Sequence, residues 1–414
     1  MAIKFLSLID FFGSGMVGGS GKVFWETNRV LSEMGHITHA ICRWSGDTDE
    51  EKYSQVKFHS YKDIETTNLI RKLTYCGKSI RRIFDETMRT IRPDILIIHS
   101  SSATFGLGSL LKKLDIPIIY YFHSPWHLEY EILAGQNGRS ILHPKYLPVK
   151  ILSFLRKYHE ASCLAHADGI ITLSSFMQKK LLSHHISIKG KKMSIIPGGA
   201  NQSEFFPIEN TVAKKQLRQR LNLSSEDFIL LATRRLVPRT GVDVLLKAFV
   251  IAKKKLLISC KLVITGKGGI AKQLKEYSEK RSISQDVIFT GYVSEKVLAE
   301  YYRCSDLSIM PTKSLEGFGL STVEAMHSAL PVIGTDVGAT PEILSFISED
   351  LIIRGCTPEA IAKKIVQFAD KSKIESLKDK VLHCATKHFT WEKHVKKLLD
   401  FCELSQQDKA DEGI

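Results

Sequence analysis

The sequence has no long apolar run, no closely spaced cysteine pair and no internal repeat. No window approaches the roughly 18 uninterrupted apolar residues that a membrane-spanning helix needs. Its 8 cysteines are scattered without a Cys-x-x-Cys pair, which argues against a disulfide framework and a zinc ribbon and predicts reduced thiols in a cytoplasmic protein. The apolar amino end has no small-residue cleavage site, so we expect residues 3–11 to form a buried strand and not a signal peptide.

Acidic residues are fewer than basic ones, and the resulting positive charge limits the kinds of partner to expect. The chain has 58 Lys and Arg against 44 Asp and Glu, a formal net charge of +14. Such a balance favours nucleic acid, anionic lipid or a small anionic substrate. Because basic stretches are not interleaved with aromatic residues as in single-strand binders, we expect no nucleic-acid partner.

Short apolar runs alternate with helical patterns along the whole chain of 414 residues, which indicates an α/β protein of two or three domains. The predicted strands form two series, at 3–11, 37–43, 56–61, 95–99, 118–123, 169–173 and 193–197, then at 228–234, 261–265, 287–290, 307–310, 331–334 and 351–353. We therefore expect two doubly wound, Rossmann-like domains that join near 201–207 and face each other across a deep cleft. The polar tail 406–414 is predicted to be disordered.

The segment from Leu315 to Met326 carries two carboxylates, Glu316 and Glu324, on either side of a Gly-Phe-Gly turn. It follows a predicted strand and opens a predicted helix, so free backbone N–H groups and the helix dipole would favour an anion there. Acids beside an anion site suit a ligand with both hydroxyls and phosphate, such as a sugar nucleotide. The alternative is a capping box, in which Ser321 caps the helix and Glu324 folds back onto its start.

This segment and its continuation, Pro331-Val332-Ile333 with Val337-Gly338 and Glu342-Ile343, resemble the signature of the retaining glycosyltransferases of family 4. The resemblance covers nearly the whole chain, because 167–175, 195–201 and 389–392 also match segments of that family. It implies a GT-B fold with an acceptor-side domain at 1–200, a nucleotide-sugar domain at 206–391 and a last helix, 392–405, that returns to the first domain. It also implies a metal-independent hexosyltransferase that uses a nucleotide diphosphate sugar as co-substrate and needs no other cofactor.

In the first domain the resemblance implies two candidate positions. Gly18 and Gly19 match a glycine pair beneath the donor phosphates, where only glycine allows such close backbone approach; a plain flexible turn is the alternative. His123 ends a predicted strand and matches a histidine close to the transferred sugar, although a lone histidine is often structural. His99 and His127 are weaker candidates.

In the second domain the resemblance assigns charge stabilisation of the diphosphate to Arg235. The family's lysine is replaced by Thr240 and its glycine by Arg234, so Arg239 is the candidate for the second positive charge. Glu316 would bind sugar hydroxyls and Glu324 the ribose. The remaining expected donor contacts are Gly266, Tyr292, Val293, Phe318, Gly319, Leu320, Ser321 and Thr322.

We expect no catalytic metal, because no His/Cys/Asp group has ligand spacing and Asp47-Thr48-Asp49 fits a solvated loop. Two basic segments, 60–93 and 147–158, are amphipathic and could contact the inner face of an anionic membrane. The plain alternative for 60–93 is a helix with its apolar face on the sheet and its cations in water. The acceptor, the sugar and the choice of UDP or GDP stay open. A glycogen-synthase-like or phosphorylase-like enzyme and a non-catalytic partner of a glycosyltransferase pair are the rival functions.

Overall fold

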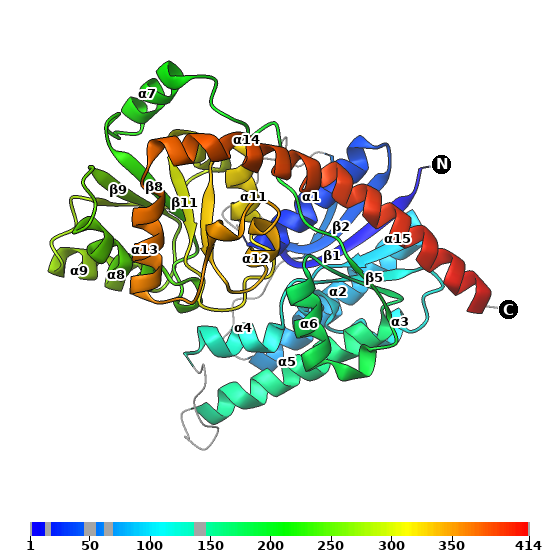
Figure 1. Ribbon diagram of the computed structural model, residues 1–414. Coiled ribbons are helices and arrows are strands. Elements are labelled where there is room, and N and C mark those ends of the chain that lie inside the picture. Colours follow the sequence, from blue (N-terminus) through cyan, green and yellow to red (C-terminus); the bar gives the residue numbers. More distant parts are fainter. Residues whose placement is uncertain (1, 13–17, 45–54, 62–68, 136–145, 413–414) are drawn as a thin grey trace. The chain divides into compact units, whose positions relative to one another are not determined.

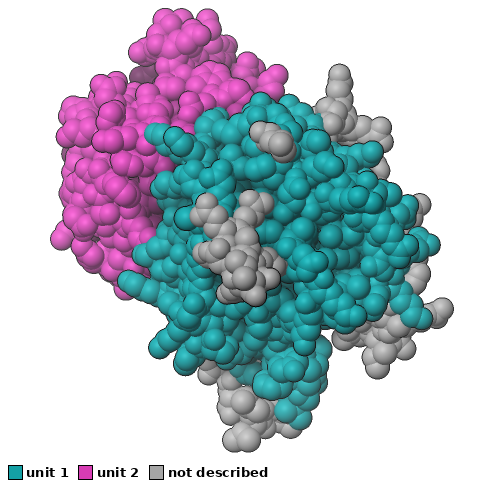
Figure 2. Space-filling view, turned by 90° about the vertical axis from the view of Figure 1, so that its right-hand side faces the viewer, with its two compact units in different colours: residues 1–197, 391–414 teal, residues 198–390 magenta. Residues whose placement is uncertain are grey.

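The computed structural model describes residues 2–12, 18–44, 55–61, 69–135 and 146–412. Contacts divide the chain into two compact units, 1–197 with 391–414 (unit 1) and 198–390 (unit 2), drawn in two colours in Figure 2. Ala200 forms a β-bridge with Thr390, and its N–H donates to the Phe389 carbonyl oxygen at 3.3 Å. The two ends of unit 2 therefore lie side by side.

Unit 1 contains a seven-stranded parallel sheet in the order β3-β2-β1-β4-β5-β6-β7. Its central strands are almost entirely apolar, as expected where helices cover both faces. The strands are β1 (Lys4–Phe12), β2 (Ile37–Trp44), β3 (Lys57–Tyr61), β4 (Ile95–Ile98), β5 (Ile118–Phe122), β6 (Gly169–Thr172) and β7 (Lys192–Ile195).

Alternate residues of these strands point to opposite faces of the sheet. Leu6 and Leu8 pack in one core with Ile80 and Phe84. On the other face the returning helix lies against the sheet, and a Cβ at Gly169 would meet the Phe401 ring at 2.6 Å. Figure 1 shows this helix beside α1. The helices of unit 1 are α1 (Gly19–Glu33), α2 (Leu69–Ile91), η1 (Ser101–Thr104), α3 (Gly108–Leu111), α4 (Trp126–Leu133), α5 (Leu147–His166), α6 (Ser175–His184), η3 (Ile186–Ile188) and α15 (Trp391–Glu412).

Unit 2 contains a six-stranded parallel sheet in the order β10-β9-β8-β11-β12-β13. Its strands are β8 (Phe228–Thr233), β9 (Cys260–Thr265), β10 (Val287–Gly291), β11 (Leu307–Met310), β12 (Val332–Thr335) and β13 (Ile352–Ile353). Helix α8 packs against α9 and α13, and α11 packs against α10 and α14. The helices of unit 2 are α7 (Thr211–Arg220), η4 (Pro238–Thr240), α8 (Val242–Lys253), α9 (Ala271–Lys280), α10 (Glu295–Cys304), α11 (Leu320–His327), α12 (Thr340–Leu344), η5 (Glu349–Leu351), α13 (Pro358–Phe368) and α14 (Lys371–His388).

The predicted α/β class with two parallel sheets is confirmed. The cleft between the predicted domains stays a prediction. Helix α15 extends to Glu412, and the predicted disorder of 406–414 stays a prediction. Residues 413–414 lie outside the described residues. Among the described helices, none combines the length and apolar character that a membrane-spanning segment requires.

Candidate functional site

The candidate site of unit 2 lies at the carboxyl edge of its sheet. Because the strands are parallel, the loops that follow β8, β9, β10 and β11 emerge at this one edge. These loops contain Arg234, Gly266, Tyr292 and Glu316. Ligands of open α/β sheets bind at such an edge.

A buried ion pair joins two of these loops. Arg234 Nη2 donates to Glu316 Oε2 at 2.5 Å and to Thr312 Oγ1 at 3.0 Å. The Arg234 and Glu316 side chains are only 6% and 14% exposed. Arg234 stands where the family resemblance expects glycine, and sequence reasoning assigned no role to its side chain. Two adjacent arginines after a buried strand, Arg234 and Arg235, could have indicated a positively charged site. The sequence does not show which of the two side chains turns inward.

Glu316 is held ionised by this surrounding charge. Burial by itself raises the pKa of Glu316, but the Arg234 guanidinium, with a smaller contribution from Arg239, outweighs it and leaves the pKa below its ordinary value. A carboxylate kept charged in a mostly buried position retains its capacity to accept hydrogen bonds from hydroxyl groups.

The backbone around Glu316 is tightly constrained. Leu315 has a φ of 53°, an uncommon value for a non-glycine residue, and its carbonyl oxygen accepts a hydrogen bond from Arg239 Nη1 at 2.7 Å. Gly338 has a φ of 72°, and a Cβ there would meet the Glu316 carbonyl oxygen at 2.5 Å. Strain that neighbouring contacts maintain is typical of functional sites.

Arg235 and Thr240 take different positions from Arg234. Arg235 is exposed, and its carbonyl oxygen accepts a hydrogen bond from Thr240 Oγ1 at 2.8 Å. Thr240 is buried and also donates to Val237 at 2.8 Å, so its side chain closes its own turn. Arg239 hydrogen-bonds with the Leu315 carbonyl oxygen, next to Glu316 in the chain. Arg234 pairs directly with the Glu316 carboxylate.

Glu324 lies in the second turn of α11 and is buried. Its carboxylate accepts a hydrogen bond from the Tyr302 hydroxyl at 3.1 Å. The N-cap of α11 is Gly319, with a φ of 96°, and Ser321 lies inside the helix. The capping box that the sequence left open is therefore not formed with Ser321 as the cap.

The other predicted donor contacts fall into two kinds. Leu320, Ser321 and Thr322 occupy the first turn of α11, where backbone N–H groups are available to an anion, although the Thr322 N–H already donates to the Gly319 carbonyl oxygen at 2.9 Å. The Phe318 side chain, by contrast, is buried against Phe389 with ring centroids 5.9 Å apart. Only its backbone can serve the site.

Gly266 and the segment Tyr292–Val293 lie together, since the Gly266 N–H donates to the Gly291 carbonyl oxygen at 2.8 Å. A Cβ at Gly266 would meet the Arg234 carbonyl oxygen at 2.1 Å, so close packing of loops already requires glycine there. Tyr292 is 47% exposed, and Lys267 Nζ lies 5.2 Å from its ring centroid.

In unit 1 a stack of aromatic rings surrounds His123. The His123 ring lies parallel to those of His99 and Tyr121, at centroid distances of 5.7 and 5.9 Å. The Tyr121 hydroxyl hydrogen-bonds with His394 Nε2 at 2.9 Å, which brings the last helix into the group. His123 Nε2 is buried and has no hydrogen-bond partner among the described residues.

These histidines are neutral near pH 7. Burial, and then the neighbouring His394, lower the pKa of His123 to about 4. Burial likewise lowers the pKa of His394 to about 4, against a hydrogen bond to the Pro197 carbonyl oxygen. A neutral imidazole can donate a hydrogen bond to a ligand hydroxyl or accept one from it, but it does not act as a charged proton donor.

Gly18 and Gly19 begin α1. Gly18 is its N-cap in an extended conformation, and Gly19 is its first residue. No acidic side chain lies in the first turn of α1, so nothing there opposes an anion. The rest of the predicted glycine loop, 13–17, and the Asp47–Asp49 segment lie outside the described residues.

Two family models match the chain, one to each half. A model described as Glycosyltransferase Family 4 matches residues 17–204, and one described as Glycosyl transferases group 1 matches residues 213–381. Together they cover most of both units.

Known proteins show the same relationship. The chain is 26% identical over 316 residues to alpha-monoglucosyldiacylglycerol synthase from Streptococcus pneumoniae, covering 73% of this chain and 64% of that protein. It is 29% identical over 219 residues to D-inositol 3-phosphate glycosyltransferase from Streptomyces avermitilis, covering 51% of this chain and 46% of that protein. The chain thus spans less than two thirds of the length of either relative.

A solved structure matches the whole chain. Sucrose-phosphate synthase from Thermosynechococcus elongatus superposes with a TM-score of 0.78 at 19% identity, covering 99% of this chain and 100% of that one. That likeness concerns the fold, while the two family models concern the sequence. The chain belongs to glycosyltransferase family 4 and has the GT-B fold.

Proposed function

We propose that this chain is a retaining, metal-independent glycosyltransferase that moves a hexosyl group from a nucleotide diphosphate sugar to a hydroxyl acceptor. The observation that carries the proposal is the Glu316 carboxylate, held ionised beside the first turn of α11 at the sheet edge of unit 2. The carboxylate offers hydrogen-bond acceptors for sugar hydroxyls, and the first turn of α11 offers N–H donors for phosphate in the same group of loops.

Each residue has a separate part in this proposal. Glu316 binds sugar hydroxyls and Glu324 binds the ribose. The amides of 319–322 and the exposed guanidinium of Arg235 stabilise charge on the departing diphosphate, the point at which preorganised donors contribute most to rate. Arg239, beside Glu316 through its hydrogen bond to Leu315, is the candidate to replace the family's lysine at Thr240, because the charge of Arg234 is already paired with Glu316.

His123 would face the transferred sugar from unit 1, as a neutral hydrogen-bonding group. Its unpartnered Nε2 is consistent with that part, because a buried polar atom without a partner costs free energy that a ligand hydroxyl would recover. Gly18 and Gly19, at the start of α1, would lie beneath the donor phosphates.

Turnover of a panel of labelled UDP- and GDP-sugars by the purified full-length chain tests the proposal. We expect at least one donor to raise the melting temperature and to release nucleoside diphosphate slowly even without acceptor. Glu316→Gln should abolish release, whereas Glu349→Gln should not, because Glu349 is an exposed carboxylate paired with Arg354 at 2.7 Å. Binding of a donor without any turnover would favour the rival function, a non-catalytic partner of a glycosyltransferase pair.

We also propose that unit 1 contacts an anionic membrane through one face of α5. Five large apolar side chains share one face of this helix and are exposed: Leu147 48%, Ile151 53%, Phe154 68%, Leu155 54% and Tyr158 71%. Lys157 lies among them, and one relative is named for a diacylglycerol product. An exposed apolar stripe with basic residues suits an interfacial helix.

Helix α2 does not share this apolar role. Its apolar residues Ile80 and Phe84 are 2% and 1% exposed in the core, which is the plain alternative that the sequence left open. Its exposed cations, Arg81, Arg82 and Arg89, still face solvent and can add electrostatic attraction of about 1 kcal/mol each near an anionic surface.

Sedimentation with phosphatidylcholine vesicles, with or without phosphatidylglycerol, tests the membrane contact. We expect binding only to the anionic vesicles, weakened by salt, and loss of binding in Phe154→Ser/Tyr158→Ser. Val212→Ser is the matched control, since Val212 is 65% exposed on α7. Equal sedimentation of wild-type protein and the double variant would overturn the assignment to α5.

A further inference from the structure

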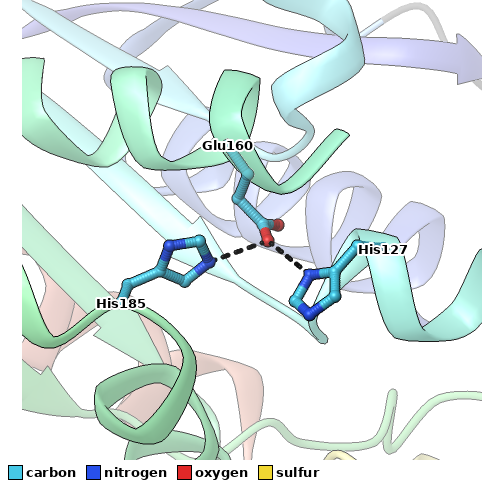
Figure 3. A group of neighbouring side chains, drawn as sticks. All are labelled: His127, Glu160 and His185. Atoms are coloured by element: carbon cyan, nitrogen blue, oxygen red, sulfur yellow. Dashed lines mark hydrogen bonds and ion pairs between the residues drawn. The ribbon is translucent and has the colours of Figure 1, made fainter. Parts of the chain in front are cut away.

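Three buried side chains converge inside unit 1 although they are far apart in the sequence. His127 lies in α4, Glu160 in α5, and His185 directly after α6. Their side chains are 6%, 2% and 1% exposed. Figure 3 shows the Glu160 carboxylate between the two imidazole rings.

The distances are close to those of a metal-ligand set. Glu160 Oε2 lies 3.1 Å from His185 Nε2 and 3.9 Å from His127 Nδ1. One ligand atom from each residue lies within 4.8 Å of the others. Ligands of a tetrahedral zinc ion at about 2.0–2.1 Å are roughly 3.4 Å apart, so the three groups would need to close up by at most about 1.4 Å.

Glu160 has no lysine or arginine partner among the described residues. Both ion pairs of Glu160 among the described residues are with histidines, which carry charge only if protonated. A buried carboxylate requires a compensating positive charge. His127 Nδ1 is buried and has no hydrogen-bond partner in the described part of the chain, so its nitrogen is aimed at Glu160 without another use.

Outer contacts orient two of the three groups. His127 Nε2 lies 3.2 Å from His184 Nδ1, so a proton on the former leaves the Nδ1 lone pair of His127 directed toward Glu160. The Trp126 backbone N–H donates to Glu160 Oε1 at 3.4 Å, which leaves Oε2 for the histidines. Partners of this kind commonly fix the ring orientation of metal-binding histidines.

We propose that His127, Glu160 and His185 bind one divalent transition-metal ion, with zinc as the ion that two imidazoles and a carboxylate suit. The ion would link α4, α5 and the turn after α6. Because α4 begins three residues after His123, the ion would also position the segment that carries His123. This structural part is separate from the proposed metal-independent transfer.

Zinc binding by the purified full-length protein tests the proposal without any activity assay. The protein is stripped with chelator, loaded with Zn²⁺, passed through gel filtration and analysed for bound metal. We expect one zinc per chain, and an X-ray absorption spectrum with two imidazoles and oxygen in the first shell. Absence of retained zinc, or a first shell that contains sulfur from any of the eight cysteines, would overturn the proposal.

Matched variants assign the ligands. Glu160→Gln and His185→Gln should each weaken zinc affinity by more than about a hundredfold, since even outer contacts are worth 10–100-fold. His59→Gln is the control, because His39 and His59 form a second close histidine pair at 2.9 Å without a carboxylate between them. Unchanged affinity in both test variants would refute the assignment. If either variant misfolds by circular dichroism, the absorption spectrum of the wild-type protein decides.

Discussion

At the scale of single residues, the inward position of Arg234 is the feature that most changes the expected site. A motif comparison treats this residue only as a missing glycine, yet its guanidinium contacts Glu316, Thr312 and the Met310 sulfur. The sequence singles out Glu316 and Glu324, and their roles in binding stay predictions. It could not show that Arg234 turns inward while Arg235 turns outward, because neighbouring residues on a loop have no fixed alternation.

The buried pair can be tested by a double-mutant cycle. Arg234→Met should lower the free energy of unfolding by about 3–5 kcal/mol, because it leaves the Glu316 charge uncompensated. Adding Glu316→Gln should restore most of that loss, since neither partner is then charged. Urea unfolding of the four proteins measures the coupling, and strictly additive losses would contradict a direct interaction.

Substitutions of Arg235 and Arg239 should differ in their effects on turnover and on thermal stability. Arg235→Ala should reduce donor turnover by about 10²–10³ with little change in melting temperature, because its side chain is exposed and lost charge stabilisation affects mainly the transition state. Arg239→Ala should lower the melting temperature as well, since it removes the hydrogen bond that holds Leu315. A nearly normal Arg235→Ala with an inactive Arg239→Ala would reverse the two assignments.

At the scale of elements, all thirteen predicted strands are present, with ends displaced by one or two residues at most. Strands such as Ile95–Ile98 are fully buried, so every residue is apolar and the apolar run alone predicts the strand. Amphipathic helices were harder to interpret. The patterns of α2 and α5 look alike in sequence, but Ile80 and Phe84 of α2 are in the core and the apolar stripe of α5 is exposed. Periodicity identifies an apolar face without identifying what covers it.

Asp306 illustrates how one carboxylate joins three elements of unit 2. It precedes β11, pairs with Lys214 and Arg218 of α7 at 2.6 Å each, and accepts a hydrogen bond from the Ile229 N–H of β8 at 2.7 Å. Burial raises the pKa of Asp306, but the two cations outweigh it and the pKa lies below its ordinary value. Such a group stabilises the fold above its unfolded pKa, and the contribution is lost as the pH falls through the folded pKa.

We therefore expect Asp306→Asn to lower the free energy of unfolding by about 3 kcal/mol or more at pH 7, and by less in acid. Asp350→Asn is the matched control. Asp350 also has two lysine partners at 3.0 Å, but it is 46% exposed, so its loss should cost at most about 1 kcal/mol. Comparable losses in the two variants would mean that burial does not set the strength of these pairs.

At the scale of the whole molecule, buried histidines make stability depend on pH. His99, His123 and His394 are neutral in the folded state, with the pKa values of the latter two lowered to about 4. The unfolded chain takes up protons near pH 6.5, whereas the folded chain does not until about pH 4. Stability is therefore full above pH 6.5 and falls as the pH is lowered toward 4.

The slope should be about 1.4 kcal/mol per pH unit for each such histidine. Urea unfolding between pH 7.5 and 4.5 measures it. His394→Gln should reduce the slope, because it removes one of these buried rings. A flat profile in this range would show that these rings accept protons without unfolding.

Because its two ends lie side by side, unit 2 is arranged as a domain inserted into the sequence of unit 1. The chain leaves unit 1 after Pro197 and re-enters it at Trp391. The Ala200–Thr390 β-bridge joins the two ends of the intervening segment, 198–390. A protease that cuts one crossing would leave the halves tethered through the other. A different domain inserted between these two adjacent points would leave the sheet and the returning helix of unit 1 uninterrupted in the sequence.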